Sequence, residues 1–188
     1  MEERIQEAMR LAERTGFAHS SVPAHGRLLQ VLAGGVPGGG LVGETGTGCG
    51  VGLAWLAAGA PADARIVSVE IDPDRARAAQ HLFAADPRIT VLHGDWRDLA
   101  AYGPFDLLSL DGGGSGKTPD AGFAEPETWL RPGGTVVMDD FTPTTGWPPV
   151  VGGGTDHARM RWLNHPRLRA TTLRLTPDMV ALVGTRIR

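Results

Sequence analysis

Cysteine is almost absent from this sequence, and so are other features that would mark a secreted or membrane-bound protein. Cys49 is the single cysteine of the 188 residues, so no disulfide can form within the chain. Disulfides are typical of oxidising compartments. Met1 is followed directly by charged residues, unlike a secretory signal. No apolar run approaches the ~20 residues of a membrane span. These absences predict a cytoplasmic protein with no membrane partner.

An excess of positive charge is also lacking. The formal net charge is -3 at pH 7, whereas nucleic-acid-binding domains usually present a basic face. We therefore expect no nucleic-acid partner, although five late arginines could form a local basic patch: Arg159, Arg161, Arg167, Arg169 and Arg174. The length and the apolar fraction of 41% suit one soluble domain with a sizeable core.

The third absence is a dinucleotide-binding fingerprint. Residues 39–54 read as a strand, a glycine-rich turn and a helix, an arrangement that exposes bare backbone and a helix N-terminus to a ligand. No register of these glycines gives Gly-x-Gly-x-x-Gly. Instead Glu44 precedes Gly46, Gly48 and Gly50. A carboxylate there would repel a pyrophosphate and suit an ammonium group, which indicates a cationic, amino-acid-like cofactor.

After this turn, strands and helices alternate, which predicts an α/β fold with a doubly wound, mostly parallel sheet. Further strands are expected at residues 65–70, 88–92, 105–110 and 135–139. Glu70 ends the second strand at the spacing where such sheets place an acid on ribose hydroxyls. Asp72 and Pro73 fit the N-cap and first position of the next helix.

The sequence ETGTGCG at residues 44–50 resembles motif I of class I S-adenosylmethionine (SAM)-dependent methyltransferases. A Gly-x-Leu-Leu segment from Gly26 resembles the helix before motif I of small-molecule O-methyltransferases, here those of the catechol methyltransferase type. A Leu-x-Pro-Gly-Gly segment from Leu130 resembles the segment before strand five of the methyltransferase superfamily. The resemblance covers residues 24–140. It implies a seven-stranded Rossmann-like sheet that ends in an antiparallel hairpin, here residues 170–175 and 179–185.

The same resemblance implies roles for the strand-end residues. Glu70 would bind the ribose of SAM, and Ile71 would pack on the adenine. Asp95 would accept from the exocyclic amine, and the backbone N–H of Trp96 would reach the ring. Asp95 could equally cap the helical turn that follows it, and both roles are compatible. Asp111 is expected among the cofactor contacts.

In the metal-dependent O-methyltransferases of this type, an Asp after strand four and an Asp-Asn pair after strand five hold a divalent ion. Asp111, Asp139 and Asp140 fall at those places, and three carboxylates suit Mg²⁺. Asp140 replaces the family's Asn, and Gly114 stands where the family has a lysine. Many related methyltransferases use no metal, and strand-end aspartates also cap helices. The acceptor is expected to be a small molecule.

Two residues are candidates for the general base. Lys117 lies in the glycine-rich loop after the fourth strand, and His157 starts a later helix. Solvated side chains are the plainer interpretation of both. Residues 111–118 also come within one residue of a P-loop, which keeps a nucleotide hydrolase as an alternative function. A non-catalytic cofactor-binding module is a third hypothesis.

The chain is expected to be one methyltransferase domain with four parts. Residues 1–35 form two helices, 39–140 the cofactor-binding core, 141–155 an active-site loop carrying Trp147, and 156–188 a helix and the terminal hairpin. A helix is also predicted over residues 120–130. His25 is expected to face solvent rather than the substrate pocket. The Trp147 loop and the first helix are candidate homodimer surfaces.

Overall fold

The computed structural model describes residues 2–118 and 121–187. Its helices are α1 (Glu2–Thr15), α2 (Pro23–Gly34), α3 (Val51–Gly59), α4 (Pro73–Phe83), the 3₁₀ helix η1 (Trp96–Ala101), α5 (Pro126–Trp129) and α6 (His157–Leu163). Its strands are β1 (Leu41–Thr45), β2 (Arg65–Glu70), β3 (Ile89–His93), β4 (Phe105–Leu110), β5 (Leu130–Phe141), β6 (Val150–Val151), β7 (Gly154–Thr155), β8 (Leu168–Arg174) and β9 (Val180–Arg186).

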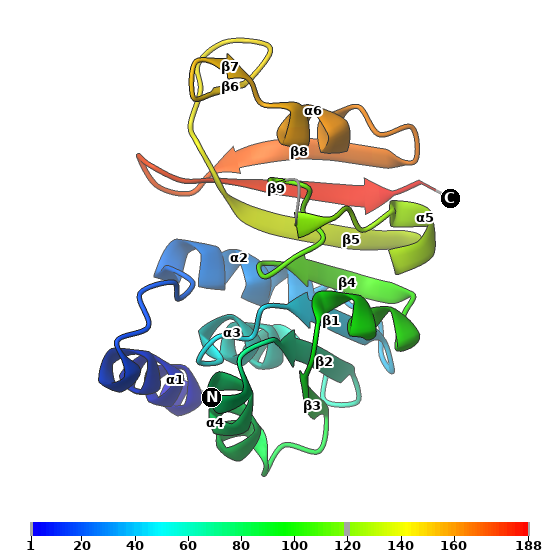
Figure 1. The fold of residues 1–188 in the computed structure, drawn as a ribbon. Coiled ribbons are helices and arrows are strands. Elements are labelled where there is room, and N and C mark those ends of the chain that lie inside the picture. Colours follow the sequence, from blue (N-terminus) through cyan, green and yellow to red (C-terminus); the bar gives the residue numbers. More distant parts are fainter. Residues whose placement is uncertain (1, 119–120, 188) are drawn as a thin grey trace.

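One seven-stranded sheet organises the molecule, in the order β3-β2-β1-β4-β5-β9-β8 (Figure 1). The first five strands are parallel, and β9 runs antiparallel to both β5 and β8. The predicted doubly wound sheet with its terminal hairpin is therefore confirmed. The strand order reverses between β1 and β4, whose ends pair Thr45 with Leu110. Open α/β sheets bind ligands outside the strand ends at such a switch point.

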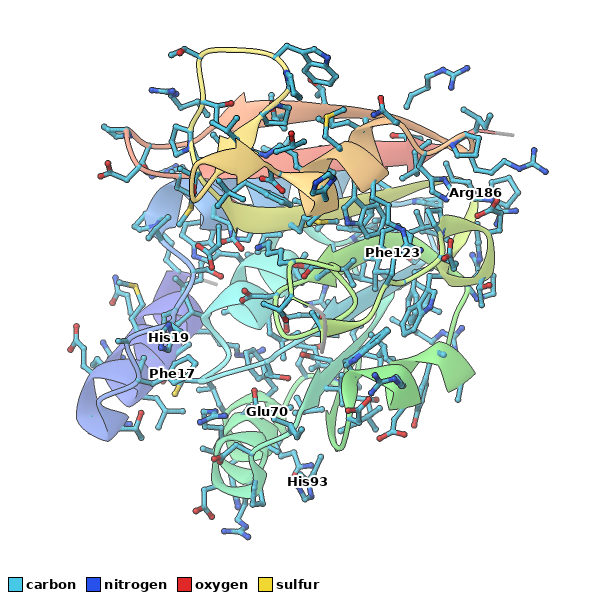
Figure 2. All side chains as sticks on the ribbon, turned by 45° about the horizontal axis from the view of Figure 1, so that its top comes forward. Phe17, His19, Glu70, His93, Phe123 and Arg186 are labelled. Atoms are coloured by element: carbon cyan, nitrogen blue, oxygen red, sulfur yellow. The ribbon has the colours of Figure 1, made fainter. Side chains whose placement is uncertain are left out.

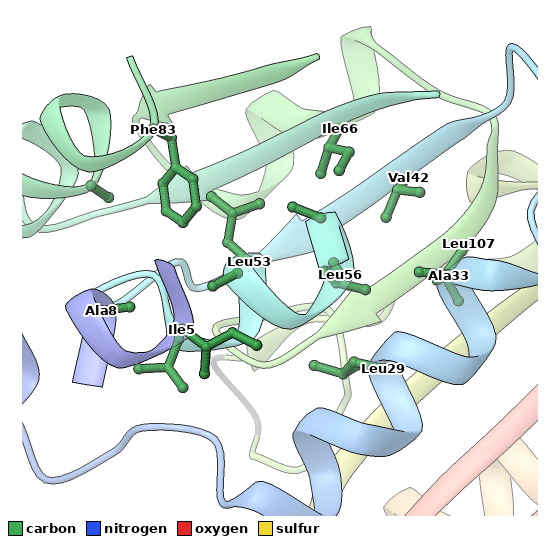
Figure 3. Close-up of a cluster of buried hydrophobic side chains, with 14 of the residues drawn as sticks. Ile5, Ala8, Leu29, Ala33, Val42, Leu53, Leu56, Ile66, Phe83 and Leu107 are labelled. Atoms are coloured by element: carbon green, nitrogen blue, oxygen red, sulfur yellow. The ribbon is translucent and has the colours of Figure 1, made fainter. Parts of the chain in front are cut away.

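The sheet buries apolar side chains on both faces because helices cover both. On one face, α1, α2, α3 and α4 pack over side chains such as Val42, Ile66 and Leu107 (Figure 3). On the other face, η1, α5 and α6 pack over Val67, Leu108 and their neighbours. Adjacent residues in β4 thus point into different cores, as strand pleating requires. The two cores hold the strand ends rigidly where the turns emerge.

Helix α2 presents a buried face that includes a histidine. His25, Leu29 and Ala33 are spaced by four residues and are all buried, as helical periodicity allows. Gly26 lets this face approach α3, since a Cβ there would lie 2.2 Å from Nε1 of Trp55. The prediction that His25 faces solvent is wrong, because its side chain is buried and lies 2.7 Å from the carboxylate of Asp139 in β5.

The segment after β4 also differs from the prediction. A helix was expected over residues 120–130, but residues 122–125 are not helical, with Phe123 in an isolated bridge to Ser115, and α5 spans only Pro126–Trp129. Asp120 lies outside the described residues. Gly114 exchanges backbone hydrogen bonds with Ala121 and Ala124, which folds the loop back on itself instead of continuing into a helix. Strand β5 begins earlier than expected, at Leu130, and extends to Phe141. None of the described helices is both long and apolar enough to span a bilayer.

Candidate functional site

A cavity of about 260 Å³ opens at the switch point of the sheet. All but two of the predicted cofactor residues line it, namely Gly46, Gly48, Glu70, Ile71, Asp95, Trp96 and Asp111. The two that do not are Glu44 and Gly50. The turns after β1, β2, β3 and β4 therefore meet around one space, as their common edge of the sheet requires.

The glycine turn after β1 is shaped by backbone contacts that no side chain would permit. Gly46 has φ +82°, and a Cβ there would lie 2.5 Å from the backbone nitrogen of Gly112. Gly112 in turn donates its N–H to the carbonyl oxygen of Thr45 over 2.7 Å. The loop after β4 thus packs directly on the loop after β1. This contact brings Asp111 to the cavity beside the glycines.

Glu70 ends β2 with a buried carboxylate that is 4% exposed. One oxygen accepts the backbone N–H of Gly48 at 2.7 Å. The other accepts the N–H of Asp72 at 3.0 Å and the guanidinium of Arg75 at 2.9 Å. Arg75 also stacks on the ring of Phe17, 5.1 Å from its centroid. These donors fix the carboxylate at the cavity wall, where Figure 2 shows Glu70 near Phe17 and His19.

Glu44 lies behind the turn rather than in the cavity wall. Its side chain is 2% exposed and accepts the hydroxyl of Ser68 over 2.5 Å. Burial raises the pKa of Glu44 to about 8, and the negative charges of Asp111 and Glu70 add to the rise, although the Ser68 hydrogen bond opposes it. Gly50 is the left-handed N-cap of α3. Contacts of Glu44 and Gly50 with a cofactor stay predictions.

The residues after β2 and β3 form the far wall of the cavity. Ile71 is 68% exposed and lines it. Asp95 lines the cavity and also caps η1, accepting the N–H of Arg97 while Asp98 accepts the N–H of Asp95. The capping role predicted for Asp95 is therefore confirmed. The Trp96 ring stacks on Trp129, with centroids 5.4 Å apart, which holds the wall in place.

Asp111, Asp139 and Asp140 come together beside the cavity. One carboxylate oxygen from each lies within 4.8 Å of the others. Asp140 has a φ of 59°, a left-handed value that is costly for a residue with a side chain and is often found at functional sites. Asp139 is 4% exposed, and its buried Oδ1 has no hydrogen-bond partner among the residues that the structure describes. An unpartnered buried carboxylate oxygen beside two further acids fits a divalent cation.

The acids differ in their electrostatics. The protein around Asp111 removes water from its carboxyl group and raises the pKa to about 7, and the charge of Asp139 adds to this rise. Burial acts in the same direction on Asp139, but the contact with His25 and the charge of Lys117 outweigh it and leave the Asp139 pKa below its usual value. The cluster therefore combines Asp139, whose pKa is lowered, with Asp111, whose pKa is raised.

The two predicted base candidates lie apart from the cofactor cavity. Lys117 Nζ donates to the backbone carbonyl of Asp139 and lies 4.8 Å from the centroid of the Phe141 ring. His157 is exposed at the start of α6, and both residues line a separate depression beneath that helix. The P-loop alternative is not favoured, because Asp111 stands where a P-loop has its first glycine, and its carboxylate would oppose bound phosphates.

Three residues at or near the site were not foreseen as site residues, namely Phe17, His19 and Arg75, and His25 was expected to face solvent instead. Phe17 and His19 follow α1 and reach the cavity across the glycine turn. Nothing in their local sequence indicates this, since it depends on how α1 packs. Arg75 lies five residues after Glu70 on α4. The sequence does contain a pattern that predicts the burial of His25, because His25 lies on the same helix face as Leu29 and Ala33.

Comparison with known families identifies one matching domain. A family model described as a methyltransferase domain matches residues 44–141. A protein of Mycobacterium bovis named "Putative O-methyltransferase" is 31% identical over 172 residues, covering 88% of this chain and 75% of that protein. One of the same name from Mycobacteroides abscessus is 33% identical over 144 residues, covering 69% and 66%. This chain thus spans two thirds to three quarters of these curated relatives.

Solved structures share the fold. The O-methyltransferase from Bacillus cereus, solved in complex with SAH, superposes with a TM-score of 0.74 at 21% identity, covering 98% of this chain and 91% of that one. TomG from Streptomyces achromogenes, an O-methyltransferase solved in complex with SAM, gives a TM-score of 0.74 at 21% identity, covering 98% and 90%. At these identities the likeness establishes the architecture and leaves individual residue roles to the geometry above.

Proposed function

We propose that the cavity at the switch point of the sheet is the SAM site of this chain. The chain belongs to the methyltransferase domain family and is a SAM-dependent O-methyltransferase. The ribose hydroxyls would donate to Glu70, and the adenine would lie along Ile71 and Trp96 near Asp95. The aminoacyl end would lie on the glycine turn with its ammonium toward Asp111. The observation that carries this proposal is that Gly48, Glu70 and Asp111 line a single cavity.

Methyl transfer from a sulfonium needs an in-line approach of the acceptor, so much of the catalysis is positioning. Asp111 belongs both to the cavity wall and to the acidic cluster. We infer that this shared residue sets the acceptor oxygen beside the transferable methyl group. The rigid strand ends of β4 and β5 would hold the geometry.

We further propose that Asp111, Asp139 and Asp140 hold a divalent ion. Such an ion would lower the pKa of an acceptor hydroxyl, as metal ions do for bound water. This chain would need that help, because Lys117 is engaged with the Asp139 carbonyl and Gly114 provides no side chain where the family has a lysine. The acceptor would then be a small molecule with a phenol or catechol oxygen.

The test is a transfer assay with methyl-labelled SAM and a panel of catechols and hydroxylated aromatic acids. We expect label on an acceptor oxygen, activity lost in excess chelator, and recovery on adding back a divalent ion. Full activity in the chelator would rule out the metal while leaving methyl transfer intact. Tight SAM binding with no transfer to any acceptor would favour the non-catalytic module instead.

A further inference from the structure

The two oxygens of the Glu70 carboxylate are unequally loaded with hydrogen-bond donors. Among the described residues, Oε1 accepts the backbone N–H of Asp72 at 3.0 Å and both Nε–H and Nη2–H of Arg75, at 3.2 and 2.9 Å. Oε2 accepts the N–H of Gly48 at 2.7 Å. A carboxylate oxygen offers about two lone pairs. Arg75 therefore exhausts the accepting capacity of Oε1, and Oε2 keeps one position.

The two ribose hydroxyls of SAM cannot both donate to this carboxylate while Arg75 holds Oε1, because two hydroxyls need two acceptor positions. The backbone donors are fixed, since Gly48 belongs to the glycine turn and Asp72 is the N-cap of α4. The Arg75 side chain is 32% exposed and is the donor that can move away. Without it, each oxygen keeps one backbone donor and has one lone pair for one hydroxyl.

Other partners for the Arg75 guanidinium lie next to Glu70. Its Nη1 is 3.4 Å from Oδ2 of Asp72, and its central carbon stands 5.1 Å from the centroid of the Phe17 ring. Phe17 is held against the glycine turn, since a Cβ at Gly48 would lie 2.7 Å from the ring. A guanidinium that leaves Glu70 therefore keeps a carboxylate and an aromatic face, which is a favourable position for a cation.

We propose that Arg75 is a positioning residue that holds the Glu70 carboxylate and is exchanged for the ribose of SAM, moving onto Phe17 and Asp72. This inference rests on the SAM site proposed above. The size of the cavity also supports it, because Arg75 lines the cavity and its volume of about 260 Å³ lies below the roughly 300–1,000 Å³ of typical small-molecule sites. Withdrawal of Arg75 enlarges the space beside Glu70.

The competing interpretation keeps Arg75 on Glu70 in the complex, where its guanidinium would donate to a ribose oxygen. The two interpretations predict opposite effects of removing Arg75. Loss of a donor to the cofactor weakens binding, whereas loss of a competitor for Glu70 strengthens it, because more of the protein is then competent to bind. S-adenosylhomocysteine is the suitable ligand, since it lacks the sulfonium charge that would respond directly to the loss of a nearby cation.

The experiment measures the affinity of the full chain for S-adenosylhomocysteine by calorimetric titration. Arg75→Met, which keeps a long side chain without its donors, should bind about three- to tenfold more tightly than the wild type. Arg75→Lys keeps the charge without the planar fork of donors, so its affinity should lie between the two. Arg77→Met is the matched control and should bind as the wild type does, because Arg77 is exposed on the same helix and pairs with Asp74.

A spectroscopic measurement follows the exchange in the unaltered protein. The chain is prepared with ¹⁵N-arginine, and the Nε–H signal of Arg75 is assigned by its absence in Arg75→Met or Arg75→Lys. We expect this proton signal to move upfield when S-adenosylhomocysteine saturates the protein, because a hydrogen bond to a carboxylate is replaced by the face of the Phe17 ring. An Arg75 that stays on Glu70 keeps its downfield signal.

Two results would overturn the proposal and leave the cofactor site intact. One is weaker or equal binding of S-adenosylhomocysteine by folded Arg75→Met. The other is an Arg75 Nε–H signal that stays in place when the ligand saturates the wild type, which decides the matter even if the variant does not fold. Absence of binding to the wild type would instead remove the SAM site proposed above, and this inference with it.

Discussion

Gly48 donates its backbone N–H to the Glu70 carboxylate across 2.7 Å, which joins the glycine turn after β1 to the end of β2. The same carboxylate holds Asp72 and Arg75 through its other oxygen. Glu70 therefore shapes the cavity as well as offering the acid that ribose hydroxyls need. A substitution at Glu70 should therefore weaken cofactor binding more than it destabilises the hydrophobic core.

We expect Glu70→Gln to weaken S-adenosylhomocysteine binding by about 10–100-fold, because hydrogen bonds to a charged group contribute roughly 1.5–3 kcal/mol. Calorimetric titration measures the change. Asp74→Asn is the matched control, since Asp74 is exposed on α4 and pairs only with Arg77 among the described residues. Equal affinity of Glu70→Gln and wild type would place the ribose elsewhere.

Gly46→Ala should abolish cofactor binding. The added Cβ would lie 2.5 Å from the Gly112 nitrogen and push the loop after β4, with Asp111, away from the turn. Gly133→Ala is a control for the cost of positive φ alone, because Gly133 has φ +86° and open space around it. The Gly133→Ala variant should lose roughly 1–2 kcal/mol of folding stability and keep the wild-type affinity for the cofactor. Similar affinity losses in both variants would contradict the close approach of the two loops.

Glu44→Gln should change the pH dependence of stability. The pKa of Glu44 rises from 4.5 to about 8 on folding, so between these values the folded state keeps a proton that the unfolded state has released. The wild-type free energy of unfolding then falls as pH rises through that window. Glu44→Gln lacks this loss. Its free energy of unfolding should therefore exceed that of the wild type by roughly 2–4 kcal/mol near pH 8.

Denaturant unfolding of both proteins from pH 5 to 9 checks this. Ser68 remains as a donor, and the neighbouring acids Asp111 and Glu70 are present in both proteins, so the difference curve isolates Glu44. A constant difference across the range would show that Glu44 is ionised in the fold. That result would favour Glu44 as a carboxylate available to an ammonium group.

Gly26→Ala should destabilise the protein by about 1–3 kcal/mol, because its Cβ would overlap the Trp55 indole and force α2 away from α3. The shift would also displace His25 from Asp139. Gly146→Ala, with no atom near its Cβ position, should be nearly neutral. Thermal unfolding compares the two, and equal melting temperatures would mean that α2 is not packed as closely as described.

The sequence predicted most of the sheet because each strand is a short apolar run that ends in a turn or an acid. Glu70, Asp95 and Asp111 could be located for the same reason, since parallel strand ends share one edge. Prediction failed at positions where tertiary packing determines the orientation of a side chain or the path of a loop. The burial of His25 depends on its contact with Asp139 of β5, and the loop at residues 121–125 depends on its pairing with Gly114. Asp139 lies far from His25 in sequence, and the return of the glycine-rich loop to Gly114 has no signature in the local pattern.

The most direct test of the central claim is calorimetric titration of the wild-type chain with S-adenosylhomocysteine, repeated with Gly46→Ala. The account predicts saturable one-to-one binding at micromolar ligand in the wild type and none in the variant, with both proteins folded. Absence of binding to the wild type, or equal binding to both, would contradict the assignment of this cavity to the cofactor.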